Sequence, residues 1–169
     1  MPSREDAIDI PFDVRARQWV AALPWRHAVL AGLGGALAIG VLALMNATDA
    51  LPLLIPPFGA SCVLVFGVPA SPFARPRNVI GGHVVSAAVG LAAVTALGAG
   101  VLGVAAGVGL AIAAMILSDT IHPPAGANPI VVALAGAGWP FLIAPVFIGA
   151  TIIVVCGLLY NRLRAGRGV

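Results

Sequence analysis

The sequence predicts an all-α polytopic membrane protein of two inverted repeats, each with three segments and a short half-helix in the middle. Three observations predict this fold. Hydrophobic residues make up 60% of the 169-residue chain and charged residues only 9%. About 20 apolar residues cross the hydrocarbon core as a helix, and the charge-free runs are of that length or longer: roughly 28–48, 50–74, 78–118 and 120–161. A Pro-Pro-x-Gly-Ala motif occurs twice, from Pro56 and from Pro123.

The two motifs lie about 67 residues apart, and the same offset aligns other positions. The aligned pairs are Val79 with Val146, Gly82 with Gly149, Gly90 with Gly157, and Gly40 with Gly107. A register without gaps indicates an internal duplication, although coincidence in a chain rich in Gly, Ala and Val is the alternative. A repeat with an odd number of segments must insert in the opposite orientation, which gives inverted topology.

Each motif predicts a break in the helix, because proline lacks an N–H and costs about 3 kcal/mol in a helix interior. The piece Phe58–Val68 that follows the first motif is only about 16 Å long at 1.5 Å per residue, so it cannot span the membrane alone. The piece after the second motif ends near Gly138. Four full-length helices are expected at about 27–46, 78–98, 101–118 and 141–160.

All nine basic residues are arginines, and they lie at both ends and in one loop. The positive-inside rule therefore predicts cytoplasmic termini and six membrane segments, in a bacterial inner membrane. Four crossings with two re-entrant pieces are the alternative. The expected domains are a cytoplasmic tail (1–25), a transmembrane domain (26–161, with repeats of about 27–98 and 99–161) and a basic cytoplasmic tail (162–169). The first tail is either an interfacial helix or disordered.

The half-helices are expected to begin near the bilayer centre, after Pro57 and after Pro124. Free N–H groups and the helix dipole at such a start attract an anion without a buried cation. Ser61 and Asn128 add neutral donors at equivalent positions. The predicted site therefore suits a small monovalent anion, and its candidate binding residues are Pro57, Gly59, Ala60, Ser61, His122, Pro123, Pro124, Gly126, Ala127 and Asn128.

Three ionisable residues are candidates for gating or proton coupling. The ordinary pKa of histidine, near 6.5, suits this role for His122 and His83, although His122 could instead cap the break. Asp119 either pairs with His122 or lies at the cytoplasmic surface. Arg77 and Asn78 are candidate vestibule residues, but for Arg77 a role in topology is favoured, and for Asn78 a helix cap.

Three stretches of the sequence resemble the HPP family of integral membrane proteins: His122-Pro123-Pro124-Ala125-Gly126-Ala127, Pro57-Phe58-Gly59-Ala60-Ser61, and Pro76-Arg77-Asn78-Val79-Ile80-Gly81-Gly82-His83. The resemblance covers roughly residues 25–160. It implies four membrane helices, and association of some members with nitrite transport. Arg75 stands where the family more often has Gln.

The expected function is a small secondary transporter or channel for a monovalent anion, nitrite first; a non-transporting assembly or sensor subunit is the alternative. No HExxH, Walker or GxSxG motif is present, so an enzyme is not expected. Neither a cofactor nor a metal site is expected, since Cys62 and Cys156 lie far apart without CxxC spacing. The expected partners are a small inorganic anion, the lipid bilayer and further copies of the chain in a dimer or trimer; no basic patch suggests nucleic acid.

Overall fold

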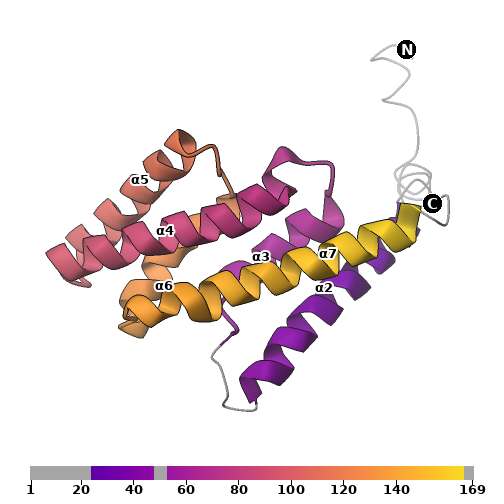
Figure 1. Ribbon diagram of the computed structural model, residues 1–169, viewed down its shortest axis with the longest axis horizontal. Helices are drawn as coiled ribbons and strands as arrows, with labels where there is room; N and C mark the ends of the chain where they lie inside the picture. The colour runs from indigo at the N-terminus through magenta and orange to yellow at the C-terminus, as the bar shows by residue number, and fades with distance from the viewer. Residues whose placement is uncertain (1–23, 48–52, 166–169) are drawn as a thin grey trace, which may run out of the picture.

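The computed structural model describes residues 24–47 and 53–165, and the regular structure in these ranges is entirely helical (Figure 1). The α-helices are α2 (Trp25–Ala47), α3 (Pro57–Cys62), α4 (Pro76–Leu97), α5 (Val101–Leu117), α6 (Asn128–Ala135) and α7 (Ile148–Ala165). The predictions for residues 1–23 and for the end of the basic tail lie outside the described residues.

Three helices are long and apolar enough to cross a membrane: Trp25–Ala47, Pro76–Leu97 and Trp139–Arg164. Pro57–Gly67 and Val101–Leu117 are shorter apolar helices. Large apolar side chains such as Leu33, Leu37 and Leu44 of α2 are exposed at the protein surface. In an integral membrane protein such side chains face lipid, because the hydrocarbon core is itself apolar.

The two motifs fold differently. In the first copy α3 begins at Pro57 and continues as a π-helical turn from Val63 to Gly67. In the second copy Pro123–Ala127 is a 3₁₀ helix, and α6 begins only at Asn128. The predicted start of a short helix near Ala125 thus falls within the 3₁₀ helix, three residues before α6 begins. Proline has no N–H to donate, and the N–H of Ala125 donates to His122 O, three residues back, in the tighter pattern.

The last long helix also differs from its predicted start near Phe141. A 3₁₀ helix (Trp139–Leu142) and a π-helical stretch (Ile143–Phe147) precede α7. Ala144 is non-helical within this stretch, with φ −128° and ψ 122°. The cause is Pro145, because a proline disfavours the α conformation in the residue before it.

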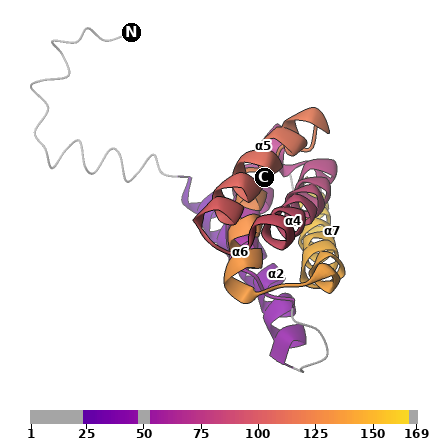
Figure 2. The same cartoon turned by 90° about the vertical axis from the view of Figure 1, so that its left-hand side faces the viewer.

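Helix α4 is central to the bundle. It contacts α5, α6 and α7, and Figure 2 shows it between α5 and α7. A turn joins α4 to α5 at Gly98, whose φ of 80° suits glycine. At the other end of the molecule His27 of α2 lies between two partners: its Nε2 is 2.7 Å from Gly67 O, and its Nδ1 is 2.9 Å from Nη1 of Arg164 on α7.

Two glycines let long helices pass close to the extended segments that precede the motifs. A Cβ added at Gly82 of α4 would lie 2.7 Å from Thr120 O and 2.7 Å from His122 Cβ. One added at Gly149 of α7 would lie 3.3 Å from Leu53 O and would overlap the ring of Phe58. Gly82 and Gly149 are aligned at the 67-residue offset of the two motifs, and the same offset relates Leu53 to Thr120.

We predict that Gly82→Ala lowers the free energy of unfolding by about 1–3 kcal/mol, the usual effect of overpacking a filled interior. Backbone atoms stand in the way, so no side-chain movement can relieve the clash. Gly109→Ala in α5 is the matched control, because nothing lies within 4 Å of an added Cβ there. Thermal unfolding in detergent, followed by circular dichroism, measures both variants; equal midpoints would contradict the close packing at Gly82.

Candidate polar site between the two motifs

Four polar side chains meet in the apolar interior: Ser61 of α3, His83 of α4, His122 just before the second motif, and Asn128 at the start of α6. Each is 0% exposed. We call these four residues the polar cluster. All four are among the residues predicted for the site, and Ser61 and Asn128 occupy equivalent positions of the two motifs.

Ser61 bridges the two histidines. Its Oγ lies 2.8 Å from His83 Nε2 and 2.9 Å from His122 Nε2. The imidazole centroids are 5.0 Å apart, with the rings inclined at 61°. Phe58 packs edge-on against His83, with ring centroids 5.1 Å apart, so an apolar wall closes this side of the pair.

The outer nitrogens of the two rings also have partners. His122 Nδ1 lies 2.8 Å from the carbonyl oxygen of Phe73. His83 Nδ1 lies 3.1 Å from Asn128 Nδ2, which also donates to the backbone oxygen of His83 at 2.9 Å. Both imidazoles are thus held at each of their nitrogens.

The partners fix the direction of the hydrogen bonds when both rings are neutral, the form that burial favours. A carbonyl only accepts, so His122 carries its hydrogen on Nδ1 and its Nε2 accepts from the Ser61 hydroxyl. The hydroxyl oxygen then accepts from His83 Nε2–H, and His83 Nδ1 accepts from the amide of Asn128. The resulting chain runs in one direction, from Asn128 through His83, Ser61 and His122 to Phe73 O.

Helix α4 also satisfies the broken backbone around the cluster. Asn78 Nδ2 donates to Ile121 O at 2.9 Å, and Ser86 Oγ donates to Ala125 O at 2.6 Å. Arg77 at the start of the same helix donates to Ser118 O at 2.8 Å. These three side chains bind carbonyl groups before, within and after the extended segment that carries His122, and so hold that segment against α4.

Comparison with known proteins covers the whole membrane part of the chain. A family model described as "HPP, transmembrane region" matches residues 20–169. The chain belongs to the HPP transmembrane family. Two curated relatives are transmembrane proteins of Dictyostelium discoideum. One is 35% identical over 147 residues, covering 82% of this chain and 52% of the relative; the other is 35% identical over 122 residues, covering 68% and 39%.

This HPP chain therefore spans about half the length of the first curated relative and less of the second. No solved structure matches it. His122, Pro123 and Pro124, which begin the first stretch that resembles the HPP family, lie at the edge of the polar cluster. His122 belongs to the cluster, and Pro123 is exposed.

The structure decides between the two alternatives for Asp119 in this HPP chain, in favour of the surface, and it corrects the role expected for Asn78. Asp119 does not pair with His122; its Oδ2 lies 2.8 Å from Arg77 Nη1, in an exposed pair with side chains 63% (Arg77) and 83% (Asp119) accessible. Asp119 has a φ of 52°, a left-handed turn between α5 and the extended segment. Asn78 does not cap α4, because Arg75 holds the N-cap position and the Asn78 side chain binds Ile121 O.

Other predicted site residues lie outside the cluster. Pro57 is buried, Gly59, Ala60 and Pro123 are exposed, and Pro124, Gly126 and Ala127 are partly buried. The N–H of Gly59 already donates to Pro56 O, and that of Asn128 to Ala125 O. Among the described residues, no group of three His, Cys, Asp or Glu side chains is arranged to hold a metal ion.

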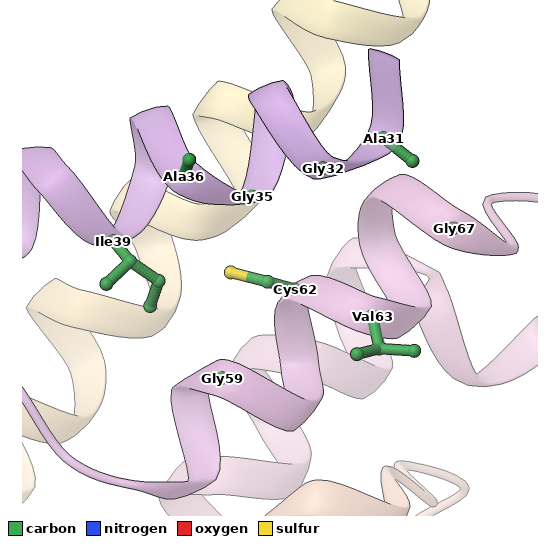
Figure 3. Close-up of a pocket in the computed structure, with 9 residues that line it drawn as sticks. All are labelled: Ala31, Gly32, Gly35, Ala36, Ile39, Gly59, Cys62, Val63 and Gly67. Carbon is green, nitrogen blue, oxygen red and sulfur yellow. The ribbon is translucent and has the colours of Figure 1, made fainter. Parts of the chain in front are cut away.

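Gly59 faces an apolar groove between α2 and α3 instead (Figure 3). The groove has a volume of about 490 Å³ and is lined by Ala31, Gly32, Gly35, Ala36, Ile39, Gly59, Cys62, Val63 and Gly67. Cys62 extends into it, so neighbouring residues of α3 serve two surfaces: Ser61 faces the polar cluster and Cys62 faces the groove.

The sequence interpretation missed Ser86 and Phe73. Ser86 lies three residues after His83, one helical turn away on the same face of α4, and that spacing could have identified it. Phe73 contributes its backbone oxygen, for which the sequence carries no signal.

We predict that Asn128→Ala lowers the free energy of unfolding by about 1–3 kcal/mol, because His83 Nδ1 and the His83 carbonyl both lose a donor in a buried setting. Asp119→Asn is the comparison, and its cost is expected to stay below about 1 kcal/mol, as for other exposed ion pairs. Chemical denaturation in detergent micelles measures the two. A larger cost for Asp119→Asn would mean that the surface pair, not the cluster, holds this region.

Proposed function

We propose that this HPP-family chain is a small secondary transporter or channel for a monovalent anion, and that the anion engages the polar cluster. The polar cluster carries the proposal. Polar side chains inside a membrane protein are costly, and they typically mark an ion or substrate pathway. Here four of them meet where both motifs converge, within a bundle whose outer surface is apolar.

The chemistry of the cluster favours a small anion with one charge. Ser61 and Asn128 are neutral donors, and the histidines can donate from either nitrogen. The described contacts of the cluster include no arginine, which argues against a large or multiply charged substrate. Because the N–H groups of Gly59 and Asn128 are engaged, we assign anion binding to the side chains. Nitrite is the first substrate to test, from the resemblance described above.

We further propose two inverted repeats, in which α2, α3 and α4 correspond to α5, α6 and α7. In support, α4 and α7 run in opposite directions (Figure 1), and Gly82 and Gly149 make corresponding contacts with Thr120 and Leu53. Such an architecture carries its site near the bilayer midplane. With six segments, the arginine distribution supports cytoplasmic termini; a bacterial inner membrane stays a prediction.

A non-transporting assembly or sensor subunit is the second candidate. The groove of Figure 3 favours it, because small residues let another helix approach closely and three glycines of this groove lie on α2 and α3. The same surface would serve a dimer or trimer of the transporter. We propose no enzymatic activity: Ser61 lies at the distance of an activated nucleophile from His122, but it is fully buried.

Uptake into proteoliposomes tests the transport proposal. We expect saturable nitrite uptake by the wild type and at least a tenfold loss with His122→Ala or Asn128→Ala, since each removes a cluster donor. Thr151→Ala is the matched control, because Thr151 is partly exposed and its hydroxyl bonds to Phe147 O, one turn back along the chain and outside the cluster. If the wild type moves no nitrite, nitrate, formate or chloride above protein-free vesicles, the subunit proposal replaces this one.

A further inference from the structure

The neutral polar cluster has no donor left for an anion. The two hydrogens of the Asn128 amide are taken by His83 Nδ1 and His83 O. The single hydrogen of each imidazole is taken by Ser61 Oγ or by Phe73 O, and the Ser61 hydroxyl is taken by His122 Nε2. An anion that entered this closed chain would find every hydrogen-bond donor already engaged.

One added proton changes this. Bound to the lone pair of His122 Nε2 that accepts from Ser61 in the neutral chain, it turns that nitrogen from an acceptor into a donor. The Ser61 hydroxyl is then released, with Pro57 O at 3.2 Å as its alternative acceptor. The N–H groups of His83 Nε2 and His122 Nε2 then both point at the Ser61 oxygen, at 2.8 and 2.9 Å, so an anion that displaces this hydroxyl meets two convergent donors. The cluster gains one positive charge at the same moment, so it becomes an anion site in both geometry and charge.

A second proton is disfavoured. The two rings lie 5.0 Å apart and both are fully buried, so two imidazolium ions would repel each other in a medium that screens poorly. The other ionisable groups on the packed elements are Cys62 of α3, Arg75, Arg77 and Asp119 at the surface, and Cys156 and Tyr160 of α7. Arg77 and Asp119 pair with each other, and none of the six has a described contact with a cluster side chain.

We propose that the polar cluster binds one proton with each anion, so that transport is electroneutral with a stoichiometry of one to one. This rests on the proposed function and names its coupling ion. The balance is simple: a proton from one compartment joins His122 Nε2, the anion displaces the Ser61 hydroxyl and binds the two ring N–H groups, and both leave together to the other compartment. No net charge crosses the membrane, and the cluster returns to its neutral chain.

The test applies a pH difference and a membrane potential separately to proteoliposomes, with the potential set by valinomycin and a potassium gradient. For the wild type, a pH difference of one unit should accumulate the anion about tenfold at equilibrium. A membrane potential of about 59 mV, which would accumulate a uniported anion tenfold, should leave the ratio unchanged. Nitrous acid that crosses the lipid reaches the same ratio without protein, so nitrite is compared by initial rates above protein-free vesicles. The equilibrium ratio is measured with nitrate, whose conjugate acid is strong.

His122→Gln should lose the response to the pH difference, because glutamine has no site for the proton. His27→Gln is the matched control, since this histidine lies outside the cluster between Gly67 and Arg164, and it should keep the tenfold accumulation. Wild-type uptake that follows the potential instead of the pH difference would overturn proton coupling while transport stands. Absence of saturable uptake would overturn the transport proposal itself. The wild-type measurement alone decides whether anion uptake is coupled to protons, even if His122→Gln does not fold.

Discussion

The structure depends on satisfying a broken backbone in apolar surroundings. Prolines interrupt the helices at both motifs, and in lipid each freed carbonyl or N–H needs a partner from the protein. Helix α4 supplies most of these partners for the second break. Its side chains Asn78 and Ser86 bind Ile121 O and Ala125 O, and Gly82 lets the segment approach. This close contact brings His83 against His122, so the packing that stabilises the break also builds the polar cluster.

Much of this arrangement could be predicted from the sequence. The helix bounds of α2, α4 and α5 fall within two residues of those expected, because charge-free runs bounded by proline and glycine leave little choice. The repeated motif alone was enough to predict Ser61 and Asn128 as equivalent donors at one site. The partner of Asp119 could not be predicted, since it depends on a left-handed turn and on a residue 42 positions away. The 3₁₀ helix at Pro123–Ala127 likewise follows from local hydrogen bonding, which a proline pattern does not specify.

The two motifs share a pattern but contribute different chemistry. Position 61 carries a hydroxyl, and the equivalent position 128 carries an amide; Ile55 occupies the place that His122 takes in the second copy. The first copy thus supplies one bridging group, and the second supplies a titratable ring and a fixed donor. A duplication alone would give two equal half-sites. The divergence gives a single asymmetric chain of hydrogen bonds with a defined direction, and the proposed proton coupling uses this asymmetry.

The direction of that chain is the central claim, and ¹⁵N NMR of histidine-labelled protein in bilayers measures it directly. The chain has three histidines, and their contacts assign the hydrogen to Nε2 in His27 and His83 and to Nδ1 in His122. At neutral pH the spectrum should therefore show one Nδ1–H imidazole, which disappears in His122→Gln. An Nε2–H form or an imidazolium at His122 would contradict the account, because the Ser61 hydroxyl would then donate to His83 Nε2 or to Pro57 O instead of His122.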